Sequence, residues 1–224
     1  MQKNHAKPRL LWTSTLTMVA AFALAGCAND GADSRGMNED DSETESAADE
    51  ATGQNGEETA LATAEIADGE GESLGQVEFI DGEQGIEVKA DTENMEPGFY
   101  GFHIHEIGEC EPDSQAPDDP EDTGDFLSAG GHIAGEEDAD HPDHAGDLPP
   151  LLVHEDGTAQ MTVATDRLDE SMLLDDDGAS VMVHSDPDNF ANIPERYLDD
   201  STPDDDTLSA GDAGDRLACG VIEE

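Results

Sequence analysis

The sequence predicts an all-β domain, built as an antiparallel sandwich or barrel, and three observations favour this class. Apolar and polar residues alternate with period two in several short segments, as in strands with one buried face. Turn signals such as Asp68-Gly69 and Asp81-Gly82 separate some of these segments. No segment shows a sustained helical period. Strands are therefore expected at residues 60–66, 75–80, 85–90, 99–106, 157–164, 179–184 and 216–222.

The N-terminal residues 1–26 have the pattern of a lipoprotein signal peptide. Lys3, Lys7 and Arg9 precede an apolar run that begins at Leu10 and is too short for a convincing membrane span. The run ends in Leu-Ala-Gly-Cys27, which resembles a bacterial lipobox and predicts cleavage before Cys27 with lipid attached to that cysteine. We therefore expect an exported protein that is lipid-anchored to the cell membrane and faces the exterior or the periplasm.

Residues 27–58 are rich in Asp, Glu, Ser, Gly and Ala and contain almost no large apolar residues. Such a segment cannot bury enough surface to offset the entropy of ordering, so a flexible acidic tether is predicted. The strand-like pattern begins after it, and residues 59–224 are predicted to form the folded domain.

The chain is extremely acidic, with 57 Asp and Glu against 8 Lys and Arg and a formal net charge of −49. Such a surface repels nucleic acid and anionic membranes, so nucleic acid is excluded as a partner. The acids are spread through strand-like segments, which indicates adaptation to high salt, where self-repulsion is screened.

The chain contains three cysteines, Cys27, Cys110 and Cys219. Lipid on the first leaves an even pair in an oxidising compartment, where disulfides persist. A disulfide between Cys110 and Cys219 is the first interpretation, and two inert buried thiols are the alternative.

Two histidines lie one residue apart in the run Gly101-Phe-His-Ile-His-Glu106. On a strand, His103 and His105 project to the same side, so both imidazoles can reach one point. Taken alone, the pair also fits two buried histidines that are satisfied by hydrogen bonds.

The rest of the chain favours a metal site. Two long loops, residues 110–152 and 185–215, follow strands, and loops of this length in a compact domain are usually functional. The first loop holds three further histidines, and another, His184, lies at a strand end. Imidazole suits copper and zinc, and zinc also accepts a carboxylate such as Asp147. His154 sits before a turn and is set aside. A Ser-His-Asp hydrolase is a poor rival, because the sequence lacks a Gly-x-Ser-x-Gly elbow.

Five motifs, in this order, resemble the copper/zinc superoxide dismutases: Gly101-Phe-His-Ile-His-Glu, Ser128-Ala-Gly-Gly-His132, His144-Ala-Gly-Asp-Leu, Val181-Met-Val-His184 and Gly211-Asp-Ala-Gly-Asp-Arg-Leu-Ala-Cys-Gly-Val-Ile222. The resemblance covers about residues 60–223, and the segment 188–197 is most similar to lipoprotein members from actinobacteria. It implies a Greek-key antiparallel β-barrel with two long functional loops. It also implies dismutation of superoxide to O2 and H2O2 at a redox-cycling copper, which would protect the cell exterior.

The resemblance also implies roles for individual residues. Arg216 would dock the superoxide anion, and His132 would bridge the two metals and supply a proton. Asp188 would link a copper ligand, His103, to a zinc ligand, His141. Copper would be bound by His103, His105, His132 and His184, and zinc by His132, His141, His144 and Asp147.

The chain departs from the family at two points. Only two residues separate His141 from His144, where most members have a longer segment, and the loop 185–215 has Arg196 as its only basic residue. The alternative function is a copper-sequestering or copper-delivery surface lipoprotein on the same fold, which would need neither Arg216 nor an open copper site. An acidic structural protein with solvated histidines leaves the ordered motifs unexplained. The sequence is compatible with a homodimer but does not decide the oligomeric state.

Overall fold

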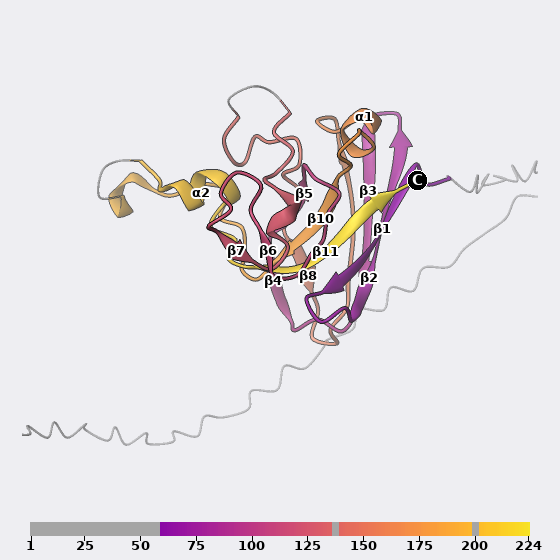
Figure 1. Cartoon of the computed structure of the whole chain (residues 1–224), viewed down its shortest axis with the longest axis horizontal. Coiled ribbons are helices and arrows are strands. Elements are labelled where there is room, and N and C mark those ends of the chain that lie inside the picture. Colours follow the sequence, from indigo (N-terminus) through magenta and orange to yellow (C-terminus); the bar gives the residue numbers. More distant parts are fainter. Residues whose placement is uncertain (1–58, 136–138, 199–201) are drawn as a thin grey trace, which may run out of the picture. The chain divides into compact units, whose positions relative to one another are not determined.

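The computed structural model describes residues 59–135, 139–198 and 202–224, and Figure 1 shows their arrangement. The predicted signal peptide (1–26), the predicted tether (27–58) and Cys27 lie outside the described residues. Within the described part, no helix combines the length and the apolar character that crossing a bilayer requires.

Three long strands form an antiparallel meander: β1 (Ala62–Asp68), β2 (Ser73–Gly82) and β3 (Gly85–Thr92). β1 and β3 follow the predicted alternation, because every second side chain is buried for most of their length. β2 is less regular, since the consecutive residues Phe79 and Ile80 are both buried. The turn between β2 and β3 is tight, since Gly82 pairs with Gly85 across it. These elements confirm the strands predicted at residues 60–66, 75–80 and 85–90.

The expected strand at 99–106 is two strands, β4 (Gly98–Tyr100) and β5 (Phe102–His105), with a break at Gly101. The Gly101 N–H donates to the Asp186 carbonyl (2.8 Å), and the His184 N–H donates to the Gly101 carbonyl (2.8 Å). A Cβ at Gly101 would lie 2.7 Å from the Ala213 Cβ, so only glycine fits this close approach. The break lets the chain change sheet partners just before the paired histidines.

The remaining predicted strands are β9 (Ala159–Thr165), β10 (Ser180–His184) and β11 (Arg216–Glu223). The main antiparallel sheet has the order β5-β10-β11-β1-β2-β3-β9. β8 (Leu151–Val153) pairs with β4 and packs beside β9, so the sheet curls back toward its first edge (Figure 1). The domain is an all-β barrel with Greek-key crossovers, as predicted.

The long segments contain short elements that the sequence pattern did not reveal. The first carries β6 (Ser114–Gln115), β7 (Thr123–Gly124) and the 3-10 helix η1 (Leu127–Ala129). The second carries the 3-10 helix η2 (Glu195–Tyr197) and α2 (Asp205–Ala210). α1 (Glu170–Leu173) lies between β9 and β10. The side chains of Asp169 and Asp204 cap the N-termini of α1 and α2, respectively.

One hydrophobic core fills the barrel, with Phe79, Phe102, Ile104 and Leu151 among its fully buried side chains. Outside it, the disulfide between Cys110 and Cys219 packs with Phe126, Ala129 and Met182. The two cysteines are 109 residues apart, so closing this loop stabilises the fold by roughly 4–5 kcal/mol in a chain-entropy model. The bond ties the first long loop to β11.

Candidate metal centre

Three histidines of the first cluster come from neighbouring strands. On β5, Phe102 and Ile104 enter the hydrophobic core, so strand alternation sends His103 and His105 to the opposite face. β10 pairs with β5 and ends at His184. The His184 ring centroid lies 4.9 Å from that of His103 and 5.6 Å from that of His105.

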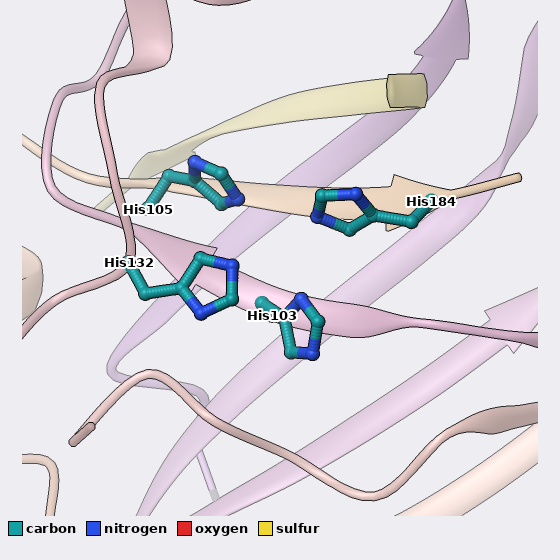
Figure 2. Close-up of side chains that lie close together, drawn as sticks. All are labelled: His103, His105, His132 and His184. Atoms are coloured by element: carbon teal, nitrogen blue, oxygen red, sulfur yellow. The ribbon is translucent and has the colours of Figure 1, made fainter. Parts of the chain in front are cut away.

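His132 completes this cluster from the first long loop. It forms an isolated antiparallel bridge with His105, and its ring centroid lies 4.1 Å from that of His103. Figure 2 shows the rings of His103, His105, His132 and His184 gathered together. Ligand atoms from these four side chains all lie within 4.8 Å of one another, and all four residues are buried.

Each of these histidines has one buried ring nitrogen without a hydrogen-bond partner. The unpaired atoms are His103 Nδ1, His105 Nε2, His132 Nε2 and His184 Nε2. A buried polar atom that stays unpaired costs free energy, so four together indicate a missing partner. Four imidazole nitrogens fit copper or zinc.

The other nitrogens of His103 and His105 are held by outer partners. His103 Nε2 lies 3.1 Å from Asp188 Oδ2, and His105 Nδ1 lies 2.9 Å from the Gly130 carbonyl oxygen. These contacts fix the ring orientations, which leaves Nδ1 of His103 and Nε2 of His105 to face the cluster centre.

A second cluster lies on the loop 132–147 and converges on the buried carboxylate of Asp147. His132 Nδ1 is 2.7 Å from Oδ1, and His141 Nδ1 is 3.1 Å from the same oxygen. His144 Nδ1 is 3.1 Å from Oδ2. Nδ1 of His141 and Nδ1 of His144 lie close to this carboxylate, but neither is oriented to form a hydrogen bond with it. Three imidazoles and one carboxylate are a donor set that zinc accepts.

His132 belongs to both clusters, because its Nε2 faces the first and its Nδ1 faces the second. Asp188 forms a second link between the two clusters. Its Oδ2 lies near His103 of the first cluster, and its Oδ1 lies 2.8 Å from Nε2 of His141 in the second. Gly211, in the left-handed region at φ 62°, makes room for this contact, because a Cβ there would lie 2.6 Å from His141 Nε2.

The surroundings set the protonation states of the metal-free site. Burial lowers the pKa of His105 and of His184 well below the usual value, and it lowers the pKa of His132 to about 4 despite the hydrogen bond to Asp147. These rings are therefore neutral at pH 7, as metal ligands must be. Burial also opposes charge on His141, but the nearby carboxylates of Asp147 and Asp188 raise its pKa to about 9.

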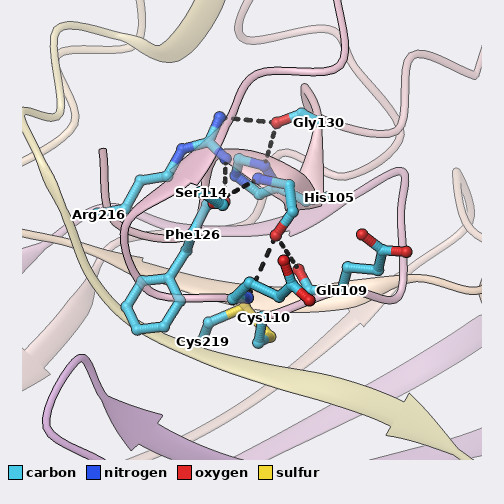
Figure 3. The surroundings of a disulfide bond; sticks show 10 residues. His105, Glu109, Cys110, Ser114, Phe126, Gly130, Arg216 and Cys219 are labelled. Atoms are coloured by element: carbon cyan, nitrogen blue, oxygen red, sulfur yellow. Dashed lines mark hydrogen bonds between the residues drawn. A yellow bond between two sulfur atoms is a disulfide. The ribbon is translucent and has the colours of Figure 1, made fainter. Parts of the chain in front are cut away.

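Arg216, the first residue of β11, lies beside the first cluster. Its guanidinium donates to the carbonyl oxygens of Phe126 (2.6 Å) and Gly130 (2.7 Å), and Gly130 also holds His105 (Figure 3). Arg216 borders an open cavity of about 640 Å³. The other charged residues that line it are all aspartates: Asp122, Asp125, Asp206, Asp212 and Asp215.

Sequence reasoning missed several supporting groups. Nη1 of Arg167 donates to the carbonyl oxygens of both Pro142 (2.9 Å) and His144 (3.1 Å). These bonds hold the short segment 141–144 that carries two histidines of the second cluster. The only sequence signal for Arg167 is that arginine is rare in this chain. Arg196 instead lies over the Tyr197 ring, 4.6 Å from its centroid, and His154 is exposed in a turn after β8. The histidines singled out from the sequence other than His154 are thus brought together.

Comparison with known proteins gives a consistent result. The family model described as copper/zinc superoxide dismutase (SODC) matches residues 73–222. A "Superoxide dismutase [Cu-Zn]" of Mycolicibacterium paratuberculosis is 41% identical over 160 residues, covering 69% of this chain and 70% of that protein. The protein of the same name from Escherichia coli K12 is 34% identical, covering 69% and 82%. The structure of a Cu/Zn superoxide dismutase from Brucella abortus is similar at a TM-score of 0.56 and 28% identity, covering 72% of this chain and 99% of that one.

Proposed function

The chain belongs to the copper/zinc superoxide dismutase family and dismutates superoxide, and from this premise we propose how its residues divide the work. Copper is held by His103, His105, His132 and His184 through their unpaired nitrogens. Zinc is held by His132, His141, His144 and Asp147. The convergence of four unpaired buried nitrogens is the observation that carries the proposal.

When bound, copper supplies the one-electron redox chemistry that turns two superoxide anions and two protons into O2 and H2O2. The protein supplies binding and protons. Arg216 docks the anion: Phe126 and Gly130 hold part of its guanidinium, and the remaining N–H donors are available to superoxide. We assign one of the two protons to Nε2 of His132, which could carry it only when that atom is not bound to copper, and the other to water.

The test is to load the full-length chain with copper and zinc and to measure both metals and superoxide decay in one preparation. We expect about one copper and one zinc per chain together with rapid decay. In an Arg216→Ala variant, copper should stay bound while the rate falls by about 10- to 1,000-fold, the range in which local charge raises on-rates. A wild-type chain that binds copper without turnover would instead support the copper-sequestering or copper-delivery function.

We further propose that the enzyme is exported and anchored at the cell surface by lipid on Cys27. The support is the sequence Leu24-Ala-Gly-Cys27 after an apolar run. Labelled fatty acid should enter the wild-type chain in cells and should not enter a Cys27→Ala variant. Label retained in the variant contradicts the anchor. The net charge of −49 supports a saline habitat for this surface.

A homodimer is the assembly that we propose. Phe99 of β4 and Leu152 of β8 lie opposite each other in the sheet register and are 55% and 44% exposed. Such a paired apolar surface favours self-association. Light scattering should give twice the mass of one chain for the wild type and a smaller mass for Phe99→Asp. A monomeric wild type contradicts the proposal.

A further inference from the structure

Phe190 has an unusual backbone conformation next to the metal centre. It follows Asp188 by two residues and has φ 57°, and Ala191 after it has φ 49°. A bulky residue in the left-handed region is a genuine outlier, and such strain persists only where the surroundings fix it. The side chain is also 43% exposed, in a chain in which aromatic residues make up only 4%.

Two contacts of Phe190 involve the hydrogen bond between His141 and Asp188. Its backbone N–H donates to Asp188 Oδ1 at 2.7 Å, and that oxygen also lies 2.8 Å from His141 Nε2. Its ring is stacked against the His141 ring, with centroids 6.4 Å apart and planes inclined by 19°. The ring of a half-exposed residue thus neighbours an imidazole that is only 2% exposed.

Neighbouring bonds hold this conformation in place. The Asn189 N–H donates to the Gly211 carbonyl (2.8 Å), and the Ala191 N–H donates to the Asn189 side-chain oxygen (2.8 Å). Gly211 is the residue that allows His141 and Asp188 to meet. Backbone hydrogen bonds of the strained turn therefore surround the contact between His141 and Asp188, and the Phe190 ring packs against the His141 ring.

We propose that Phe190 is a positioning residue for His141. The ring limits rotation of the imidazole and keeps water from the bond between His141 and Asp188, so that His141 Nδ1 stays directed at the zinc position. Outer partners that fix ligand orientation change metal affinity by about 10- to 100-fold. This inference rests on the proposed zinc site and extends it to a residue that is not a ligand.

The experiment compares variants of the full-length chain for zinc affinity, by competition with a chelator, and for the visible spectrum of cobalt bound at the zinc position. Phe190→Ala should weaken zinc binding by about tenfold and shift the cobalt bands. Phe190→Gly relaxes the backbone but also lacks the ring, so it should show the same loss. Phe190→Tyr should restore wild-type affinity and spectrum. Tyr197→Ala, which removes a more exposed aromatic ring from the same loop, is the matched control and should change neither.

The outcomes separate the inference from its premise. Circular dichroism and a thiol assay establish that each variant is folded and disulfide-bonded. Wild-type zinc binding with unchanged affinity and spectrum in Phe190→Ala overturns the role of Phe190 alone. Full recovery in Phe190→Gly also overturns it, because the strain would then be the cause. A wild-type chain that retains no zinc overturns both the zinc site and this inference.

Discussion

The two halves of the metal centre are built in different ways. Three of the proposed copper ligands, His103, His105 and His184, lie on paired strands of the main sheet. Of the proposed zinc ligands, His132 and Asp147 are bridged to β5, whereas His141 and His144 lie in described residues that belong to no strand. The positions of His141 and His144 depend on individual contacts with Asp147, Asp188 and Arg167. Strand register fixes three of the proposed copper ligands, whereas His141 and His144 depend on outer contacts and would depend on zinc itself to close the loop.

The largest expected effect comes from removing a strand-borne ligand. His184→Ala should abolish dismutation while leaving a folded, disulfide-bonded domain, because the side chain lies at the end of β10 and outside the hydrophobic core. Superoxide decay and bound copper are the measurements. A variant that keeps more than about a tenth of wild-type turnover would contradict the copper assignment.

Removing a loop-borne ligand should affect the other half. His144→Ala should weaken zinc binding by more than about 100-fold, since even outer partners contribute 10- to 100-fold. Thermal stability should also fall, because zinc closes the loop but takes no electron. Metal titration and thermal unfolding are the measurements. Loss of copper and activity as complete as in His184→Ala would refute this division between the halves.

pH should also separate the halves. In the metal-free fold the pKa of His141 is raised to about 9, so between pH 7 and 9 zinc must displace a proton, and its apparent affinity should rise about tenfold per pH unit. The stability that the His141 proton confers is full below pH 6.5 and is lost as the pH rises through 9. Burial keeps His105 and His184 neutral, so copper affinity should vary less over this range. Titration of each metal at several pH values tests the contrast, and equal slopes would contradict it.

Arg167 offers a milder test of the loop. Arg167→Ala removes hydrogen bonds to the carbonyls of Pro142 and His144 and should weaken zinc binding by about three- to tenfold. Copper affinity should stay unchanged. Arg196→Ala removes the same charge from a residue that stacks on Tyr197, so it is the matched control for zinc titration. If both variants lose zinc equally, the cause is the lost positive charge and not the lost hydrogen bonds to Pro142 and His144.

The smallest expected effect concerns the approach to the copper side. Aspartates line the cavity beside Arg216, so at low salt the field should oppose the arrival of an anion. Raising salt from 0.1 to 1 M shortens the Debye length from about 10 to 3 Å, which removes the distant repulsion first. The bimolecular rate per folded, copper-loaded chain should therefore hold level or rise, and Asp206→Asn should raise it at low salt. A steep fall in the wild-type rate would show that local attraction by Arg216 dominates.

Features that follow from local pattern could be predicted from the sequence. Alternation placed His103 and His105 on one face, and counting cysteines identified the pair Cys110 and Cys219. β8 escaped prediction because three residues cannot display a period, and α1 and α2 are too short to show a helical one.

The supporting contacts of the site escaped prediction for a different reason. Arg167 reaches residues more than twenty positions away, and the Gly130 carbonyl is a backbone group that every sequence contains. Only the tertiary approach of distant segments gives these groups their role. The strained backbone of Phe190 carries no local signal either, because phenylalanine ordinarily avoids that conformation.

The carboxylate of Asp188 makes the two metal affinities mutually dependent. Since one oxygen orients His103 and the other orients His141, ordering either ring also orders part of the other site. Thermodynamic linkage requires the resulting cooperativity to be symmetric: the factor by which zinc changes copper affinity equals the factor by which copper changes zinc affinity. The final loaded state therefore has the same free energy whichever ion arrives first, and the order of loading is a question of kinetics alone.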